Sequence, residues 1–473
     1  MKALLIFTDN NSIHRIAYHP GVAYIASYLK KYGHEVKCRY IDSKDQYTEL
    51  LEFVKTYRPN VVGFTSVETQ FIYVMEIASL IKEVHSCFVI CGGVYVTLSP
   101  ECVKKARSLD GIIRGEGEYA IVELLDKLEK GEDYRSTKNF CYYDTDKDSV
   151  VMNPMHPLID DLDALPYPEK AFQDYQKVMD STGYVLFNFT RGCPYRCTYC
   201  SNHALARVYD HKSNKIRFRS PESCISEIKY VLDNFDCEST WRRKKTIWIL
   251  DDLFTFDKKW LYKFLELYKR EINKPFMCQT RSNLASKEMF AKLKEANCVR
   301  VVMGIESGNE FIRNEIMKRG ISDEQMFNSF KWAHEAGLET IGICMIGLPY
   351  ETKEMIEDTI MVAASTNTAS GVNVFYPYSG TELRRICEKN GFLPKDYDQY
   401  EIRERRESIL NLPTISKDEI LFYYENWEKL VWAERPLSFK KIQYYCNTLY
   451  RKGLSCGNTL SKKHRMKEAE VDI

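Results

Sequence analysis

The sequence predicts an α/β protein with a doubly wound parallel sheet at the N-terminus, then a partial (β/α)6 barrel, then a helical C-terminal region. Over about the first 130 residues, short apolar runs alternate with amphipathic helical patterns, as in a parallel sheet covered by helices. The alternation stops and later returns as six further β/α units. The predicted organisation is a sheet domain at 1–135, a linker at 136–184, a barrel at 185–385 and a helical region at 386–473.

The first five apolar runs predict the strands of the N-terminal sheet. They cover residues 3–7, 35–40, 60–64, 88–91 and 111–114, and helical patterns cover residues 21–32, 47–57, 71–84, 99–106 and 118–129. Ligands of such sheets bind beyond the carboxyl ends of the strands. We therefore expect a ligand at the loops that follow Phe7, Phe64, Cys91 and Arg114.

Two further patterns predict the linker and the barrel. A polar stretch at 144–148 and prolines at 154, 157, 166 and 168 indicate a linker with a short hairpin. The barrel strands are expected at 185–190, 246–250, 276–280, 300–305, 340–346 and 371–376, with the active site at their carboxyl ends. In the helical region, the Tyr and Trp residues at 422–432 favour a packing face over a cover for the substrate cavity.

Charge and cysteine usage narrow the function classes. The 67 basic and 66 acidic residues nearly cancel, so the chain lacks the charge excess of a nucleic-acid-binding protein. The N-terminal apolar run is too short for a secretory signal, and no run approaches the roughly 20 apolar residues of a membrane span. We therefore expect a cytoplasmic protein without nucleic-acid or membrane partners, whose 16 cysteines are free thiols or metal ligands.

Three of these cysteines stand together after the first predicted barrel strand. Cys193, Cys197 and Cys200 lie within eight residues, at the mouth of the predicted barrel. Three thiolates without an adjacent fourth indicate an iron–sulfur cluster with one exchangeable iron. Spacing alone leaves two alternatives open, namely a zinc ion completed by His203 and three unrelated thiols.

The spacing Cys193-x3-Cys197-x2-Cys200, with the aromatic Tyr199 before the last cysteine, resembles the signature of the radical S-adenosylmethionine (radical SAM) enzymes. The resemblance implies that the three thiolates are catalytic ligands of a [4Fe–4S] cluster, whose fourth iron binds S-adenosylmethionine (SAM). It also implies reductive cleavage of SAM to methionine and a 5′-deoxyadenosyl radical. An electron donor such as flavodoxin or ferredoxin is then an expected partner, and Tyr199 is expected beside the cofactors.

The resemblance continues along the barrel, strand by strand. Residues 249–254 resemble the family's acidic stretch near the SAM amine, 303–308 its fourth-strand motif, and 345–349 the fifth-strand segment that lies against adenine. The cofactor-binding residues that it implies are Asp251, Asp252, Arg281, Glu306, Ser307 and Gly347. Taken singly, such residues more often cap a helix, pair with a charge or end a strand. Their order along the chain is what favours a SAM site.

The N-terminal part resembles the cobalamin-binding domain that precedes the barrel in one radical SAM subclass. Similar segments at 19–26, 33–36, 59–65, 91–95 and 114–118 carry this resemblance. It implies bound cobalamin, although the fold can also be retained without the cofactor. The residues expected against the nucleotide tail, where small side chains let a ligand approach the backbone, are Thr65, Ser66, Gly92 and Gly93.

One feature of many cobalamin proteins is absent from the sequence. The Asp-x-His-x-x-Gly loop, whose histidine binds cobalt, has no counterpart after the first predicted strand. His14 and His19 lie nearby. We expect either of them to be a surface or capping residue, with cobalt ligation as the alternative.

Together the resemblances imply a cobalamin-dependent radical SAM methyltransferase that acts on an unactivated carbon of a small-molecule or peptide substrate. One alternative is a radical rearrangement, cyclisation or oxidation with a non-methylating or absent cobalamin. Another is a non-catalytic iron–sulfur or cobalamin carrier. A carrier needs no adenosine pocket, so the SAM-like motifs favour an enzyme. No motif in the sequence identifies the substrate.

Overall fold

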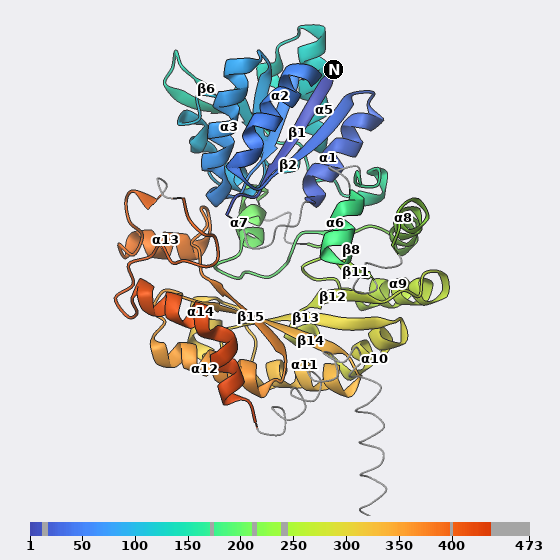
Figure 1. The fold of residues 1–473 in the computed structure, drawn as a ribbon, viewed down its shortest axis with the longest axis vertical. Helices are drawn as coiled ribbons and strands as arrows, with labels where there is room; N and C mark the ends of the chain where they lie inside the picture. The colour runs from blue at the N-terminus through green and yellow to red at the C-terminus, as the bar shows by residue number, and fades with distance from the viewer. Residues whose placement is uncertain (12–17, 171–174, 211–214, 238–244, 398–400, 437–473) are drawn as a thin grey trace, which may run out of the picture.

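The computed structural model describes residues 1–11, 18–170, 175–210, 215–237, 245–397 and 401–436. Its two large sheets follow one another along the longest axis, with the N-terminal sheet at the top of Figure 1 and the barrel sheet below it. The predicted order of a doubly wound sheet and then a partial barrel is confirmed. Within the described ranges, no helix is long and apolar enough to cross a membrane.

The N-terminal sheet has seven strands in the order β2-β1-β3-β4-β5-β6-β7. They are β1 (Lys2–Thr8), β2 (Glu35–Ile41), β3 (Val61–Thr65), β4 (Phe88–Gly92), β5 (Gly111–Ile113), β6 (Phe140–Asp144) and β7 (Ser149–Met152). The first five are parallel, and the strand order reverses at β1 and β3, where ligands of such sheets bind. The hairpin β6–β7 pairs antiparallel with β5 and extends this sheet into the predicted linker.

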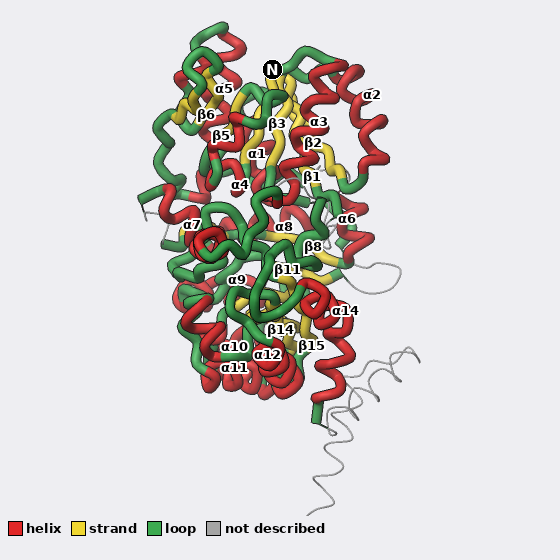
Figure 2. Tube along the Cα trace, turned by 90° about the vertical axis from the view of Figure 1, so that its left-hand side faces the viewer, coloured by secondary structure: helices red, strands yellow, loops and turns green. Residues whose placement is uncertain are grey.

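Helices cover both faces of this sheet, as Figures 1 and 2 show. They are α1 (Pro20–Lys31), α2 (Tyr47–Tyr57), α3 (Phe71–Val84), α4 (Val94–Leu98) and α5 (Glu118–Lys130). The neighbours Leu4 and Leu5 of β1 belong to two different hydrophobic cores, because successive side chains of a strand point to opposite faces. The predicted helix at 99–106 is wrong. Pro100 lacks the N–H that would continue α4, and Pro100–Lys104 forms a 3-10 helix.

The barrel sheet is an open row of six parallel strands. In spatial order they are β8 (Tyr184–Phe187), β11 (Thr246–Ile249), β12 (Phe276–Thr280), β13 (Cys298–Glu306), β14 (Glu339–Ile346) and β15 (Ala369–Val374). The helices between them are α8 (Pro221–Asn234), α9 (Lys258–Glu271), α10 (Lys287–Glu295), α11 (Asp323–Glu335) and α12 (Lys353–Ser365). The first predicted strand divides, because β9 (Thr190–Arg191) pairs with β10 (Arg217–Phe218) in a separate ribbon.

The remaining helices connect and cover these sheets. They are α6 (Tyr175–Thr182), α7 (Ser201–Val208), α13 (Glu382–Lys389) and α14 (Lys417–Glu434). α14 packs against α12 and β15 (Figure 1), where the Tyr423 hydroxyl donates to Glu357 at 3.1 Å and the Trp427 indole donates to Ser370 at 3.2 Å. Tyr423 and Trp427 thus form the predicted packing face, while Phe422 and Trp432 at the ends of the aromatic stretch are exposed.

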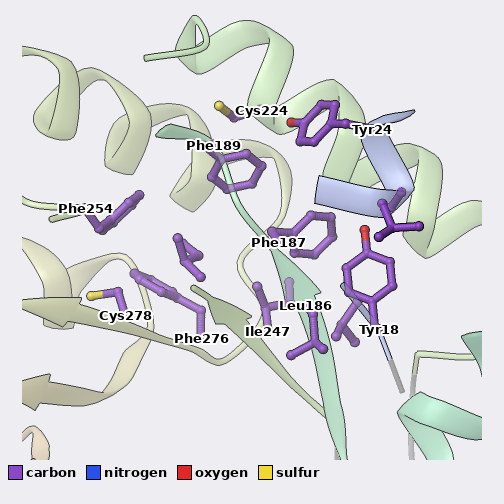
Figure 3. Packing of buried hydrophobic residues seen from close by; sticks show 14 of the residues in the cluster. Tyr18, Tyr24, Leu186, Phe187, Phe189, Cys224, Ile247, Phe254, Phe276 and Cys278 are labelled. Atoms are coloured by element: carbon purple, nitrogen blue, oxygen red, sulfur yellow. The ribbon is translucent and has the colours of Figure 1, made fainter. Parts of the chain in front are cut away.

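A continuous hydrophobic core joins the N-terminal sheet to the barrel. Figure 3 shows Tyr18 and Tyr24, which come from the N-terminal domain, beside Phe187 of the barrel strand β8. The buried ammonium group of Lys170 lies among the rings of Tyr18, Tyr175 and Phe187, with its nitrogen 4.8, 5.2 and 5.0 Å from their centroids. It also donates to the Tyr18 hydroxyl at 3.0 Å. The two domains therefore share one buried interior.

Candidate active site

The three predicted cluster ligands lie in the loop that joins β9 to α7, beyond the carboxyl end of β8. Cys197 is buried, while Cys193 and Cys200 are half-buried. Between them, the backbone and hydroxyl of Thr198 donate to the carbonyls of Met317 and Ile316, at 3.1 and 2.6 Å. These bonds fix the loop against the segment that follows β13.

The thiols occupy an environment that disfavours their charged forms. Burial raises the pKa of Cys193 to about 11 and that of Cys200 to about 12, and the neighbouring Asp252 raises both further. Thiolates at such a place need a positive partner, which a bound metal centre supplies. The donor set therefore fits a thiolate-bound cluster. Among the described residues, no three His, Cys, Asp or Glu side chains, the three cysteines included, are grouped so as to hold a metal ion, so the fit rests on the chemistry of the donors.

Two residues predicted for the cofactor site, Tyr199 and Glu306, meet at a buried arginine. Arg319 donates from one nitrogen to the Tyr199 hydroxyl and, at 3.1 Å, to the Glu306 carboxylate. Its other terminal nitrogen donates to the Gly304 carbonyl at 3.0 Å. Only 7% of the Arg319 side chain and 13% of the Glu306 side chain are exposed. The cluster loop is thus joined to the end of β13.

The end of β13 is strained where Glu306 lies. Glu306 has φ +61°, a left-handed conformation that is uncommon outside glycine, and the pairing of β13 with β14 shifts register there. A Cβ at Gly304 would lie 2.4 Å from the Glu306 carboxylate oxygen and 3.0 Å from Arg319. A larger residue at position 304 would therefore displace the Glu306 carboxylate or the Arg319 guanidinium. Ser307 is fully buried, and its hydroxyl accepts from the backbone N–H of Asn309 at 3.2 Å.

Arg281, one of the residues expected at the SAM site, braces the same region in the structure. Its guanidinium donates to the Arg319 carbonyl and, at 2.8 Å, to Asn283. It also lies over the Tyr195 ring at 3.7 Å from the centroid. Because only 5% of Arg281 is exposed, its donors serve the protein in this arrangement.

The two adjacent aspartates after β11 have different surroundings. Asp251 is fully buried and accepts from the backbone of Phe189 at 3.0 Å and from the backbone and hydroxyl of Thr190 at 2.5 Å. Burial raises the pKa of Asp251 to about 7, although these hydrogen bonds oppose the shift. Asp252 is exposed and accepts from Asn202 of α7 at 2.7 Å. Of the pair, Asp252 is the one that can reach a ligand.

Gly347 marks the turn after β14 with φ +79°. Its backbone N–H and that of Leu348 donate to the Glu351 carboxylate at 2.6 and 3.2 Å. Glu351 is fully buried, and its burial raises the pKa to about 8. Glu351 was not among the predicted site residues, although its position four residues after a glycine at a strand end is a usable signal.

The four residues expected against the cobalamin tail gather at the carboxyl ends of β3 and β4. Thr65, Gly92 and Gly93 line a cavity of about 240 Å³ that we call the sheet cavity. Thr65, Ser66 and Gly93 also line a second cavity of about 380 Å³, the interdomain cavity. Gly93 has φ +99°, and a Cβ there would lie 2.7 Å from the Ser66 backbone nitrogen. The glycine thus permits the close approach of these two loops.

The two cavities differ in their surroundings. Seven of the twenty residues that line the sheet cavity are apolar side chains of the N-terminal domain: Leu5, Val22, Ile25, Phe64, Ile90, Ile113 and Ile121. The interdomain cavity is bounded by the ends of β1 and β3, by Leu250 of the barrel and by Glu404 and Arg405 of the C-terminal region. A flat apolar group fits the first cavity, and the second lies between the two sets of strand ends. The contribution of Glu404 and Arg405 was not predicted.

His19 lines both cavities as the residue that caps α1. Its Nδ1 accepts from the Val22 backbone N–H at 3.2 Å, and burial lowers its pKa to about 4. The neutral ring therefore carries its proton on Nε2. This geometry matches the predicted capping role. His14 lies outside the described residues.

Comparison with known proteins agrees with both halves of the site. The model of the B12 binding domain matches residues 10–125, and that of the radical SAM superfamily matches residues 187–363. The chain is 29% identical over 406 residues to an uncharacterised methyltransferase of Pyrococcus horikoshii. The aligned residues cover 83% of this chain and 84% of the relative.

Two further matches also cover most of this chain. The anaerobic magnesium-protoporphyrin IX monomethyl ester cyclase of Rubrivivax gelatinosus is 27% identical over 363 residues, or 73% of this chain and 62% of the relative. The solved structure of the cobalamin-dependent SAM radical enzyme OxsB, with aqua-cobalamin and SAM bound, superposes with a TM-score of 0.69 at 16% identity. That match covers 95% of this chain and 71% of the other.

The fold and the site define a protein that joins a B12-binding domain to a radical SAM barrel. The chain belongs to the radical SAM superfamily, among its members with an N-terminal B12-binding domain. It is an enzyme whose cofactors are a [4Fe–4S] cluster, SAM and cobalamin. The zinc site, the unrelated thiols and the non-catalytic carrier are therefore set aside.

Proposed function

We propose that the protein is a methyltransferase that replaces a C–H bond at an unactivated carbon of a small molecule by C–CH3, with the methyl group taken from SAM. The observation that carries this proposal is the interdomain cavity of about 380 Å³, which lies between the strand ends of the B12-binding domain and the end of barrel strand β11. When bound, the cluster and SAM supply hydrogen abstraction, and cobalamin supplies methyl transfer.

The chain's own residues position the reactants and keep water away. Cys193, Cys197 and Cys200 hold the cluster at the barrel mouth, and Arg319 fixes their loop through Tyr199. The shared hydrophobic core borders the interdomain cavity, and this apolar wall protects a radical there from solvent.

The remaining contacts are assigned by position. For SAM, we assign Asp252 to the amino group because it is exposed beside the cysteine loop. We assign the backbone of Glu306, Ser307 and Gly347 to the strand ends around the nucleoside, because the polar side-chain atoms of Glu306 and Ser307 already bond within the protein. Asp251 and Arg281 act through their neighbours, because their polar atoms already bond within the protein. We assign the cobalamin contacts to Thr65, Ser66, Gly92 and Gly93, which line the two cavities.

A flavodoxin or ferredoxin is the proposed electron donor, since reductive SAM cleavage requires one electron from outside the chain. A second candidate function is radical ring closure or another rearrangement. It is favoured by the similarity to the Rubrivivax gelatinosus cyclase. The two candidates differ in whether a methyl group leaves SAM for the product.

The test uses anaerobically purified full-length protein with a reconstituted cluster, cobalamin, a reductant, candidate small-molecule substrates and SAM with a trideuterated methyl group. We expect a product that carries the trideuteromethyl group and a matching amount of 5′-deoxyadenosine. The Cys197→Ala variant should form neither. Product that forms equally well without cobalamin, or without the label, would overturn the methyltransferase assignment in favour of ring closure or rearrangement.

A further inference from the structure

The wall of the sheet cavity is not made by the B12-binding domain alone. Most lining residues come from its strands and helices, but Asn188 and Arg191 come from the start of the barrel. They stand just after β8, and Cys193 follows Arg191 by two residues. The segment that closes this cavity thus leads directly into the cluster loop.

Asn188 connects the cavity to the SAM side of the site. Its carbonyl accepts from the Tyr24 hydroxyl of α1 at 3.3 Å. Its side-chain amide donates to the Asp251 carboxylate at 3.2 Å, the same carboxylate that holds the backbone of Thr190. A displacement of Asn188 would therefore be felt at the end of β11 and at the first residue of β9.

Arg191 makes the corresponding connection to the rim of the cavity. Its guanidinium pairs with Glu116 at 3.3 Å and with Glu118, both in or next to the loop between β5 and α5, and it lies over the Tyr24 ring at 4.9 Å. The side chains of Arg191 and Glu116 are only 19% and 16% exposed. Such shielded charge pairs have well-defined geometry, so a ligand that contacts one member shifts the others.

Arg217 provides a natural comparison for Arg191. It donates to the same carboxylate, with one nitrogen 2.7 Å from Glu116 Oε1, and to the Ile159 carbonyl at 2.7 Å. Yet Arg217 is not among the residues that line the sheet cavity. The two arginines therefore share a partner and differ in access to the ligand.

We propose that Asn188 and Arg191 make the radical SAM barrel part of the binding site for the nucleotide tail of cobalamin, and that the cluster loop thereby responds to the tail. This inference rests on the assignment of cobalamin to the two cavities. The apolar interior of the sheet cavity takes the flat aromatic base. Asn188 and Arg191 meet the ribose and phosphate, while the Glu116 carboxylate stays paired with Arg191 and Arg217.

The proposal distinguishes two ligands that share a corrin ring. Cobinamide lacks the nucleotide tail that cobalamin carries. Full-length protein with a reconstituted cluster is titrated with hydroxocobalamin and, separately, with dicyanocobinamide, and binding is followed by equilibrium dialysis and visible absorbance. The variants are Arg191→Lys, which retains the charge but loses the planar fork, and Arg217→Lys as the matched control.

We expect Arg191→Lys to weaken hydroxocobalamin binding about tenfold and to leave dicyanocobinamide binding within about twofold of the unchanged protein. Arg217→Lys should retain the preference for hydroxocobalamin. The electron paramagnetic resonance spectrum of the reduced cluster should change when hydroxocobalamin is added and not when dicyanocobinamide is added, and Arg191→Lys should reduce that change.

Equal loss of both ligands in Arg191→Lys, or the same selective loss in Arg217→Lys, would overturn the proposal, since either result indicates a general structural effect. Iron content and melting temperature show whether each variant is folded. If Arg191→Lys does not fold, Asn188→Ala replaces it with the same expectations. A protein that binds hydroxocobalamin selectively through Arg191 but transfers no methyl group would contradict the proposed function and leave this inference intact.

Discussion

The hydroxyl of Tyr199 donates to the carboxylate of Glu306 at 3.3 Å, although the two residues are 107 positions apart in the chain. Arg319 bonds to both of them. This contact joins the loop that carries the three cysteines to the strained end of β13. The position of the cluster therefore depends on a charge network that includes none of the three cysteines.

Removal of the arginine from this network should loosen the cluster loop. We expect Arg319→Met to lower the free energy of unfolding by about 3–5 kcal/mol, because Glu306 would stay buried without its cation. Iron content after reconstitution should fall as well. Denaturant unfolding and iron assays check this. The control, Arg300→Met, breaks the exposed pair with Glu339 and should cost less than about 1 kcal/mol, so an equal effect of both variants would contradict the network's role.

A methyl group at Gly304 should disturb the same network from the backbone side. Gly304→Ala places a carbon 2.4 Å from the Glu306 carboxylate, so we expect a loss of about 1–3 kcal/mol and weaker SAM cleavage. Deoxyadenosine formation and thermal melting are the measurements. In β15, Gly371→Ala meets its nearest atom at 3.9 Å and serves as the matched strand variant. Unchanged deoxyadenosine formation in Gly304→Ala would show that the close packing is not needed.

Glu351 should make stability fall as pH rises. Its pKa is about 8 in the folded protein against an ordinary value of 4.5, so the folded state binds more protons than the unfolded state between these values. Stability is then highest below about pH 4.5 for this group and decreases up to about pH 8, by at most about 1.4 kcal/mol for each pH unit.

The measurement for Glu351 is urea unfolding of the unchanged protein and of Glu351→Gln at pH 5, 6, 7 and 8. Glutamine retains an oxygen for the N–H groups of Gly347 and Leu348 and cannot ionise. The free energy of unfolding of Glu351→Gln should therefore increase relative to that of the unchanged protein as the pH approaches 8. If the two free energies of unfolding differ by the same amount at every pH, the raised pKa of Glu351 is refuted.

His19 should matter to α1 and not to cobalt. Because its Nδ1 accepts from Val22, we expect His19→Asn to retain stability and His19→Ala to lose about 1 kcal/mol, since asparagine also caps helices. The visible spectrum of bound cobalamin should be the same in both variants. A spectral shift common to His19→Asn and His19→Ala would instead identify the imidazole as a cobalt ligand.

Most of the fold was predictable because each strand and helix has its own period in the sequence. The helices at 47–57 and 71–84 and the strand at 276–280 have the predicted bounds, since their apolar patterns are uninterrupted. Apart from the helix at 99–106, which Pro100 interrupts locally, the missed features are tertiary. The hairpin β6–β7 was recognised locally, but its pairing with β5 was not, because strand partners are not written in a local pattern.

The candidate site divides in the same way. The spacing of Cys193, Cys197 and Cys200 identified the loop, because its ligands are close in sequence. Arg319 could not be found, since an isolated arginine in a sequence is usually solvated and its burial depends on β13. The contacts of Arg281 could not be predicted either. Its partner is a backbone carbonyl, which every residue has, so no residue type in the sequence marks it.

The interior shared by Tyr18, Tyr24 and Phe187 also limits how the molecule can open. A hinge that swung the B12-binding domain away from the barrel would expose these rings to water, together with the ammonium group of Lys170 that lies among them. Rigid-body separation is therefore a costly route for cofactor loading. We expect the two domains to melt in a single cooperative transition. We expect the corrin to enter through local opening of the segments at the outer edge of the interdomain cavity.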